Sequence, residues 1–347
     1  MSLYVNANIE KEQKLSQYKG VLVFGEQKDG KILTVTYELL TRGRKLADEL
    51  GCELSCVLLG EEIDGLEEVV KRGADKVFFI KDAILKNFLP RPYSKAITKL
   101  CEELKPEVIV AAATTTGRTV MPLVAAMLET GLTADCTELT IDPDTRLLLQ
   151  TRPAIGGNIM ATIKTPDHRP QMATVRPKSA KPAAFNAART GEVIVKEFDG
   201  ATFFTPEKFL EYIKDTTQEV SIEEADIIVA GGKGMKNADG FKMVEELARI
   251  LGAGVGATRD AVEFGWTTYP HQIGLSGKTV APKLYFAFGL SGKIQHLAGM
   301  QTSEVVVAVN KDPEAQIFKV ADFGIVGDVF EVVPMMIEAF KNLKANA

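Results

Sequence analysis

The sequence lacks the features that mark membrane, secreted and metal-binding proteins. No apolar run approaches the roughly 20 residues that span a bilayer, and residues 1–18 are polar and charged, without the apolar core of a signal peptide. The cysteines show neither CxxC nor metal-ligand spacing: Cys52, Cys56, Cys101 and Cys136. Iron–sulfur and zinc sites are therefore disfavoured, and we expect a cytoplasmic protein with reduced thiols and no membrane insertion.

Several catalytic signatures are also missing. The chain has no Walker A sequence, no HExxH, and no GxGxxG followed by an acidic residue about 20 positions on. Ser276 lies in a Ser-Gly pair rather than in GxSxG, and no triad pattern accompanies it. These absences disfavour a dehydrogenase of the ordinary NAD-binding Rossmann type and a serine hydrolase.

Charge and composition narrow the class further. The formal net charge is −5, which disfavours nucleic acid and anionic membranes as main partners. Apolar residues make up 46% of the chain and charged residues 25%, as in ordinary globular proteins. At 347 residues the chain exceeds the size of one ordinary core, so we expect two domains.

The first half of the chain alternates apolar strands with amphipathic helices. The expected strands cover residues 20–26, 53–59, 76–80 and 107–113, and the expected helices lie near 35–49, 66–72 and 94–104. Buried strands that alternate with helices indicate a parallel sheet covered on both faces. A turn at 114–118 leads into a helix, 120–128. That turn can cap the helix or receive an anion, and the cap is favoured.

From residue 140 to 198 the sequence is β-rich, which indicates added or antiparallel strands that complete the first domain. A connector with a short helix, 206–214, follows, and a second alternation starts at Asp226. We therefore expect an α/β protein with domains at 1–210 and 211–347. Each should have a mainly parallel sheet flanked by helices, Rossmann-like and nucleotide-hydrolase-like in the first domain and Rossmann-like in the second.

The most informative stretch is 284–310. An apolar strand, 284–288, enters a turn at 289–292, and a helix starts near Lys293 with Gln295 and His296 in its first turn. A second apolar strand ends at Asn310. A glycine-containing turn before a helix is typical of phosphate sites. Because two more strand-end turns, 231–234 and 258–259, belong to the same domain, we expect a nucleotide-type ligand at their common edge.

Several polar residues near these turns can carry chemistry, and each has a plainer alternative. Arg259 can place a cation beside a ligand that gains negative charge, or it can be a surface arginine. His296 can donate to a ligand carbonyl, or it can be solvated or act as a cap. Residues 269–282 form either a ligand-binding loop or a plain surface loop. Asn310 and Asp328 can bond ribose hydroxyls or an adenine edge, or make a turn and a helix cap.

The C-terminal motif LYFAFGLSGKIQHLAGM…VVVAVNKDPEAQIFKVADFGIVGD resembles the signature of electron-transfer flavoprotein alpha subunits. The resemblance continues upstream through IIVAGGKGMKN, GAGVGATRDAV and HQIGLSGKTVAPKLY. It extends more weakly through TTTGRTVMPLVAAML, TGLTADCTEL and TRPAIGGNIMATI. It therefore covers nearly the whole chain, and its C-terminal motif is long enough to be specific.

This resemblance implies one half of an αβ heterodimer that carries electrons, with one FAD held non-covalently by the C-terminal domain. The implied partners are the beta subunit and an acyl-CoA dehydrogenase or a similar flavoenzyme. Whether the complex also bifurcates electrons between NADH, ferredoxin and an acyl-CoA dehydrogenase stays open, because the deciding contacts lie largely in the beta subunit. The first domain is expected to act as the scaffold of the heterodimer.

The family pattern also implies which residues contact FAD. Arg259 is expected beside the isoalloxazine, Ser276 near its N5/O4 edge and His296 at its O2/N1 side, so that Arg259 and His296 favour the anionic reduced flavin. The full set implied is Lys233, Thr258, Arg259, Gln272, Ile273, Gly274, Leu275, Ser276, Ser291, Gly292, Lys293, Ile294, Gln295, His296, Asn310, Asp328 and Val329.

Two of these positions depart from the common family pattern. Lys233 stands where arginine is frequent, which keeps the charge but loses bidentate phosphate geometry. Ser276 stands where threonine is frequent and keeps the hydroxyl donor. A non-redox adenine-nucleotide-binding module is the alternative function, since it uses the same phosphate-binding turn without Arg259 beside a ring. A self-sufficient dehydrogenase is a third, and it requires a substrate pocket with its own base.

Overall fold

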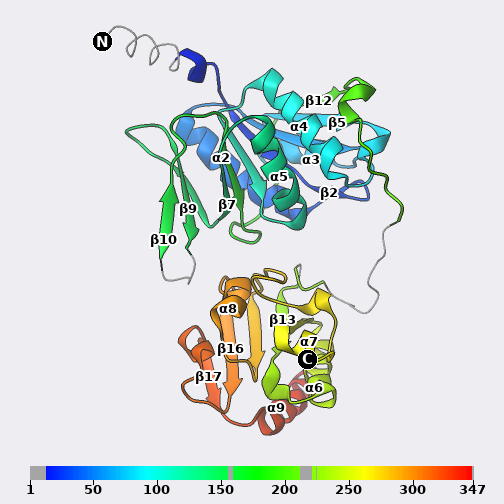
Figure 1. The fold of residues 1–347 in the computed structure, drawn as a ribbon, viewed down its shortest axis with the longest axis vertical. Helices are drawn as coiled ribbons and strands as arrows, with labels where there is room; N and C mark the ends of the chain where they lie inside the picture. The colour runs from blue at the N-terminus through cyan, green and yellow to red at the C-terminus, as the bar shows by residue number, and fades with distance from the viewer. Residues whose placement is uncertain (1–12, 155–158, 212–220, 224, 346–347) are drawn as a thin grey trace. The chain divides into compact units, whose positions relative to one another are not determined.

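The computed structural model describes residues 13–154, 159–211, 221–223 and 225–345. The chain divides into two compact units, residues 1–211 and 212–347. Each unit contains a parallel sheet with helices packed on it (Figure 1). The expected fold class, an α/β protein with two mainly parallel sheets flanked by helices, is confirmed.

The first unit is built on a seven-stranded parallel sheet in the order β12-β5-β4-β1-β6-β11-β7. Its strands are β1 (Val21–Phe24), β4 (Leu54–Gly60), β5 (Lys76–Lys81), β6 (Val108–Ala112), β7 (Leu132–Cys136), β11 (Gln171–Val175) and β12 (Glu192–Lys196). Its helices are α2 (Thr34–Leu50), α3 (Leu66–Lys71), α4 (Pro90–Leu104) and α5 (Thr115–Met127), with short 3-10 helices η1 (Ala83–Leu85) and η2 (Gly200–Phe203). The side chains of β1 alternate between two apolar clusters, one on each face, which is why this strand reads as a continuous apolar run.

Smaller strands complete the first unit. A three-stranded antiparallel sheet joins β8 (Glu138–Ile141), β9 (Leu148–Pro153) and β10 (Met160–Ile163), and β2 (Gln27–Lys28) pairs with β3 (Lys31–Ile32) as a short hairpin. By contrast, β11 and β12 join the large sheet in parallel. The β-rich region therefore supplies both the antiparallel and the added strands expected of it.

Two expected helices differ from the structure. Helix α5 begins at Thr115, a turn before the expected residue 120, because the Thr114 Oγ1 accepts a hydrogen bond from the Gly117 N–H at 3.0 Å and caps it. The favoured cap interpretation is thereby confirmed. The expected helix at 206–214 is wrong over residues 206–211, which form no helix, and its remainder lies outside the described residues. Phe209 is 41% exposed and Leu210 is 88% exposed, so the apolar side chains of this segment gain no burial that would stabilise a helix.

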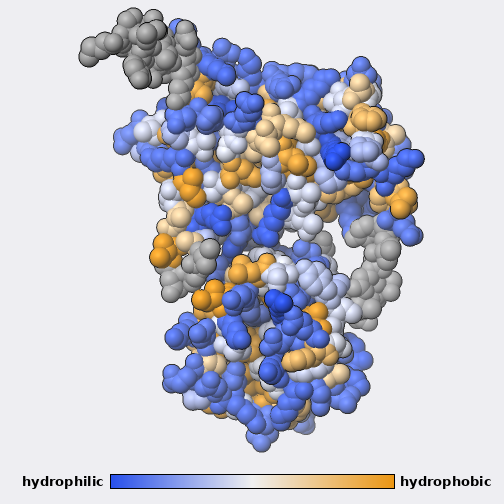
Figure 2. All heavy atoms as spheres, in the orientation of Figure 1, coloured by the Kyte–Doolittle hydropathy of each residue, from blue (hydrophilic) through white to orange (hydrophobic). Residues whose placement is uncertain are grey.

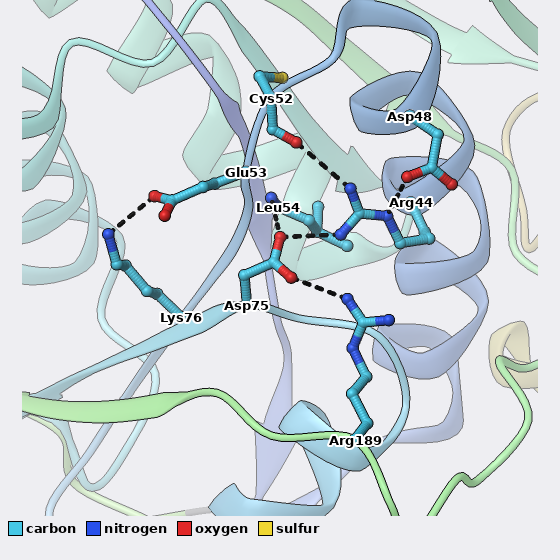
Figure 3. Close-up of polar contacts among 8 residues, drawn as sticks. All are labelled: Arg44, Asp48, Cys52, Glu53, Leu54, Asp75, Lys76 and Arg189. Carbon is cyan, nitrogen blue, oxygen red and sulfur yellow. Dashed lines mark hydrogen bonds and ion pairs between the residues drawn. The ribbon is translucent and has the colours of Figure 1, made fainter.

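A partly buried ion-pair junction joins three segments of the first unit around Asp75 (Figure 3). The Asp75 carboxylate accepts hydrogen bonds from the Arg44 guanidinium and the Leu54 N–H, each at 2.8 Å, and from the Arg189 guanidinium at 2.8 Å. Burial by itself raises the pKa of Asp75, but the hydrogen bonds and the two guanidinium charges outweigh it, and the net pKa lies below its usual value. The junction holds α2 and the segment before β12 against the ends of β4 and β5.

Replacing Asp75 by asparagine is expected to lower the free energy of unfolding by about 1 to 2 kcal/mol at pH 7. The Arg44 and Arg189 guanidinium groups lose the carboxylate they share, and only Arg44 keeps another, that of Asp48 at 2.8 Å. A lowered folded-state pKa stabilises the protein above the unfolded pKa and ceases to do so as the pH falls through the folded value. The difference between wild type and Asp75→Asn should therefore shrink below about pH 4 in denaturant titrations. Glu53→Gln is the matched control, since Glu53 pairs with Lys76 at 2.8 Å but is 62% exposed. Equal losses in the two variants would contradict the junction's role.

The second unit has a five-stranded parallel sheet in the order β14-β13-β15-β16-β17. Its strands are β13 (Ile227–Gly231), β14 (Gly254–Ala257), β15 (Leu284–Phe288), β16 (Val305–Asn310) and β17 (Phe323–Val326). Its helices are α6 (Ala238–Leu251), α7 (Arg259–Glu263), α8 (Ile294–Met300) and α9 (Val329–Ala345), with 3-10 helices η3 (Lys233–Met235), η4 (Tyr269–His271) and η5 (Gln316–Lys319). The chain runs from β13 to β14 on one side and then crosses to β15 on the other, so a topological switch point lies between β13 and β15. In the part of the chain that the structure describes, no helix is long and apolar enough to cross a membrane.

Candidate cofactor site

The strand-end turns of the second unit meet at the carboxyl edge of its sheet. All five strands are parallel, so the segments after β13, β14, β15, β16 and β17 leave from the same edge. At the switch point the turns after β13 and β15 interlock, because the Gly234 N–H donates to the Gly289 carbonyl at 2.8 Å. A Cβ built on Gly234 would lie 2.7 Å from the Gly289 Cα, so the two backbones touch. This edge brings together the turns that the sequence singled out.

The loop at 272–276 is tied to the sheet and to α8 by its own backbone. The Ile273 N–H donates to the Ala257 carbonyl at 2.9 Å, and the Leu275 N–H donates to the Gln295 carbonyl at 2.8 Å. Gly274 has φ +145°, and a Cβ there would lie 2.6 Å from the Gln295 carbonyl oxygen. The loop therefore requires glycine at this position, both for its conformation and for its approach to α8.

Ser276 is held from two sides. The Gln272 side-chain amide donates to the Ser276 Oγ at 3.0 Å and to its carbonyl at 3.1 Å. The Tyr269 hydroxyl also donates to the Ser276 carbonyl, at 2.8 Å. Because its carbonyl and Oγ both accept, the Ser276 hydroxyl keeps its proton to donate to a ligand. These hydrogen bonds order the loop around Ser276, which supports the expectation that residues 269–282 are more than a plain surface loop.

The turn at 289–292 packs against η5. The Ile317 N–H donates to the Ser291 carbonyl at 3.1 Å. Gly292 has φ +75°, and a Cβ on it would overlap the Ile317 nitrogen and lie 2.6 Å from the Ile317 Cα. Helix α8 follows from Ile294, with Lys293 as its N-terminal flanking residue. The turn and the start of α8 therefore place Ser291, Gly292 and Lys293 in one continuous backbone segment beside the 272–276 loop.

Thr258 and Arg259 follow β14. The Thr258 Oγ1 is buried and has no hydrogen-bond partner within the described residues. Arg259 is the first residue of α7, and its side chain is 68% exposed. Its Nε donates to the Glu263 Oε1 at 2.7 Å, a contact that raises the pKa of the Arg259 guanidinium and keeps it charged. Arg259 is thus a surface arginine in this chain taken alone, held in place by a carboxylate one turn along the helix.

His296 differs from the expectation of a ring N–H free for a ligand. Its side chain is buried; Nε2 lies 2.9 Å from the Tyr285 hydroxyl, and Nδ1 lies 3.1 Å from the Ile273 carbonyl oxygen. Burial lowers the pKa of His296 to about 4, against an opposing effect of the Ile273 carbonyl. The ring is therefore neutral near pH 7, and it is not the solvated or capping residue of the plainer alternative either.

Asn310 and Asp328 make the turn and cap contacts of their plainer alternatives. The Asn310 amide donates to the Leu290 carbonyl at 2.9 Å, and its Oδ1 accepts from the Asp312 N–H. The Asp328 carboxylate accepts from the Phe330 N–H at 2.9 Å and pairs with Lys311 at 2.6 Å. The side chain of Val329 is 3% exposed and packs into the core beneath α9, so it cannot line a site through its side chain.

Lys233 begins η3 after β13, and its ammonium lies 5.9 Å from the centre of the Phe264 ring. This contact links the turn after β13 to the segment that follows Arg259. Exposed apolar side chains occur beside the same loops, at Phe264, Tyr269, Leu275 and Ile294. Figure 2 shows that apolar residues also reach the surface in other places on both units. Exposure alone therefore does not single out this edge.

Three residues that matter here were missed from the sequence. Glu263 lies at i+4 from Arg259, a spacing that predicts an ion pair on a helix. The sequence around Gly299 does not indicate its role. A Cβ on Gly299 would overlap the Gly274 nitrogen, which belongs to a segment distant in sequence. Tyr285 lies in an apolar strand, and its buried hydroxyl should have prompted a search for a partner.

The residues present fit a flavin nucleotide. The unpartnered Thr258 Oγ1, the Ser276 hydroxyl and the exposed Arg259 guanidinium lie on segments that meet at one sheet edge. Gly274 and Gly292 let the backbone pack closely in the turns at this edge, and neither residue adds a side chain that would obstruct a ligand. No group of His, Cys, Asp and Glu side chains in the described part of the chain could hold a metal ion. A few placed polar groups with donors are what fixes the orientation of a non-covalent nucleotide ligand.

The corresponding edge of the first unit holds a small cavity beside a carboxylate. The Glu26 carboxylate after β1 accepts a hydrogen bond from the Thr114 hydroxyl at 2.5 Å, beside the N-terminus of α5. The cavity at this place measures about 30 Å³ and is lined by Glu26, Tyr93 and Thr116 among others. Small-molecule pockets are about 300 to 1,000 Å³. The Glu26 carboxylate lies beside the N-terminus of α5, where an anion would otherwise be stabilised, so a second negative charge is disfavoured at this place.

Comparison with known proteins agrees with this division. Residues 21–200 match the family model described as the electron transfer flavoprotein domain, and residues 221–301 match the electron transfer flavoprotein FAD-binding domain. The chain is 50% identical to the electron transfer flavoprotein subunit alpha of Thermoanaerobacterium thermosaccharolyticum, over 95% of this chain and 100% of that protein.

Two further relatives carry more specific names. The chain is 42% identical to the acryloyl-CoA reductase electron transfer subunit beta of Anaerotignum propionicum, over 95% of this chain and 98% of that protein. It is 41% identical to the lactate dehydrogenase (NAD(+),ferredoxin) subunit LctC of Acetobacterium woodii, over 97% of this chain and 82% of that protein.

Proposed function

The chain belongs to the electron transfer flavoprotein alpha-subunit family, whose FAD-binding domain it carries, and we propose that it shuttles electrons between flavoprotein dehydrogenases and other redox partners. The observation that carries this proposal is the match of both family domains along one chain, together with 50% identity over 95% of it. The redox function rests on the second unit, because residues 221–301 within it match the FAD-binding domain of the family.

FAD supplies the redox chemistry when bound, and the chain's residues hold it and set its environment. We propose that Arg259, Thr258 and Ser276 contact the ring system, and that 272–276 and 291–296 line the ribityl and pyrophosphate groups. Arg259 provides positive charge, while Ser276 and the loop N–H groups provide hydrogen-bond donors. We propose that the phosphates and the adenosine end of FAD are contacted by Lys233, Asn310, Asp328 and Val329. The last three would do so through backbone groups, because their side chains already have internal contacts or are buried.

The remaining residues support a carrier over an enzyme with its own acid or base. His271 and His296 in the second unit are both buried and bonded to backbone carbonyls, of Val255 and Ile273 respectively. Neither is placed to move a proton to a substrate. An electron carrier needs no such group, because the charge and hydrogen bonds around the flavin are its functional levers.

The proposed partner is a beta subunit in an αβ heterodimer, with the first unit as scaffold, in the cytoplasm. Its redox partners are proposed to be dehydrogenases that act on acyl-CoA or related substrates. The names of two relatives support this direction: one serves acryloyl-CoA reductase, and the other is a subunit of a lactate dehydrogenase that uses NAD and ferredoxin. We further propose, on the basis of these two names, that the complex bifurcates electrons with NADH and ferredoxin.

The test is to co-express the chain with its beta subunit and record the visible spectrum of the purified pair. We expect flavin absorbance from the pair, with one FAD per heterodimer assigned to this chain. We also expect this absorbance to bleach when a reduced acyl-CoA dehydrogenase is added. A colourless pair that releases only adenine nucleotide on denaturation favours the non-redox module and overturns the proposal. Ferredoxin reduction by NADH, measured only when the dehydrogenase acceptor is present, tests bifurcation separately.

A further inference from the structure

The base of the 272–276 loop is fixed to strand β14 at two points. The His271 Nδ1 lies 2.9 Å from the Val255 carbonyl oxygen, and the His271 side chain is 7% exposed. The Ile273 N–H donates to the Ala257 carbonyl at 2.9 Å. Because both of these carbonyls belong to β14, the 3-10 helix η4 and the first residues of the loop form a firmly held base.

Tyr269, the first residue of η4, connects this base to the tip of the loop. Its hydroxyl donates to the Ser276 carbonyl at 2.8 Å. Its own carbonyl accepts from the Gln272 N–H at 2.9 Å, so its backbone belongs to the fixed turn. The Tyr269 side chain is 61% exposed, and the hydrogen bond of its hydroxyl is therefore the main contact that holds it across the loop.

Ser276 accepts three hydrogen bonds from two side chains. Besides Tyr269, the Gln272 Nε2 lies 3.1 Å from the Ser276 carbonyl oxygen and 3.0 Å from the Ser276 Oγ. A carbonyl oxygen can only accept, so the Gln272 atom beside it must be the amide nitrogen, which carries two hydrogens. One hydrogen goes to the carbonyl and the other to Oγ. The Ser276 Oγ is thus an acceptor for Gln272, and its own hydrogen remains to be donated elsewhere.

We propose that Tyr269 is a positioning residue of the flavin site: its hydroxyl fixes the Ser276 carbonyl, which keeps the Gln272 amide on the Ser276 Oγ and directs the remaining hydroxyl hydrogen at the ligand. This inference rests on the proposed function, because Ser276 is proposed there to contact the ring system. Tyr269 is absent from the set of residues that the family pattern implies.

The direction of the Ser276 hydroxyl matters because a hydrogen bond weakens steeply as it bends. A donor aimed at a ring that gains negative charge stabilises the reduced ring more than the oxidised one. Without the Tyr269 hydroxyl, the Ser276 carbonyl keeps only the Gln272 amide as donor. The next residue is Gly277, whose backbone is free to turn with this carbonyl. The loop tip then samples several orientations, and the Ser276 hydroxyl meets the ring in only some of them.

The experiment is a spectroelectrochemical titration of the FAD-loaded heterodimer in wild type, Tyr269→Phe, Ser276→Ala and the double variant, each with one FAD per pair. We expect Ser276→Ala to lower the equilibrium constant of one-electron flavin reduction by about tenfold, and Tyr269→Phe to lower it by about threefold. The double variant should match Ser276→Ala, because Tyr269 acts only through Ser276. Tyr93→Phe is the matched control, since the hydroxyl of this tyrosine in the first unit also donates to a carbonyl, at 2.9 Å. It should leave the constant unchanged.

The outcomes separate two failures. An unchanged constant in Tyr269→Phe, or two effects that add in the double variant, overturns the positioning role and leaves the electron-carrier function intact. An equal fall in Tyr93→Phe overturns it as well, because the effect would then be general loosening. An unchanged constant in Ser276→Ala overturns it without any substitution at Tyr269. A pair without flavin absorbance overturns the proposed function instead.

Discussion

Replacing Gly292 by alanine is expected to weaken FAD binding by the assembled heterodimer by about a hundredfold. An L-residue at φ +75° costs about 1 to 2 kcal/mol, and overlap with the Ile317 backbone costs about 1 to 3 kcal/mol more. The strain and the overlap both act on the 289–292 turn. This turn precedes α8 and contacts η5 through the Ser291 carbonyl. The sum, about 2 to 5 kcal/mol, corresponds to about one and a half to three and a half factors of ten in an equilibrium constant, and the expected hundredfold loss lies within this range. Titration of the FAD-free pair with FAD measures it, and the unfolding midpoint shows whether the unit stays folded.

Gly265→Ala separates strain from overlap. Gly265 has φ +72°, almost the same as Gly292, but a Cβ on it meets nothing within 4 Å. It should therefore lower stability by about 1 kcal/mol and leave FAD affinity within about twofold. If the two variants lose FAD equally, the effect is general strain and the close approach of 289–292 to η5 has no special role.

The fold could be predicted from the sequence because its signals are local. The strands read as continuous apolar runs since both faces of each sheet are covered, as the two clusters around β1 show. Turn glycines mark where strands end at the carboxyl edge. The misplaced start of α5 has a local cause as well: the Thr114 cap was seen but assigned to a turn before the helix. Only the connector helix failed on tertiary grounds, because Leu210 is 88% exposed among the described residues and gains no burial from a helix there.

The candidate site was less predictable because its chemistry depends on contacts distant in sequence. His296 is neutral near pH 7 because burial lowers its pKa. Its ring nitrogens contact Tyr285, 11 residues earlier, and the Ile273 carbonyl, 23 residues earlier. No pattern within the helix indicates either contact. Asn310 and Asp328 were ambiguous from the start, and their side chains make the turn and cap bonds. The sequence could locate the sheet edge at which the site lies. It could not show which polar atoms at that edge remain free, because packing decides this.

Removing the charge of Arg259 should lower the flavin's first reduction potential in the FAD-loaded heterodimer. The reduced ring gains negative charge, and a nearby cation stabilises that form relative to the oxidised one. We expect Arg259→Ala to lower the one-electron potential by roughly 60 mV, a tenfold change in the equilibrium constant. Spectroelectrochemical titration measures the potential, and the FAD content of each sample must stay at one per pair.

The neighbouring carboxylate makes the sign of this effect testable from the other side. Glu263 accepts from the Arg259 Nε at 2.7 Å and offsets part of its charge. Glu263→Gln removes that offset and should raise the potential, opposite to Arg259→Ala. Arg249→Ala is the matched control, since Arg249 is an exposed arginine in the last turn of α6. A fall as large in Arg249→Ala as in Arg259→Ala would mean that overall net charge sets the potential. A shift confined to Arg259 and reversed at Glu263 identifies the local charge of the Arg259–Glu263 pair, and not the net charge of the chain, as its cause.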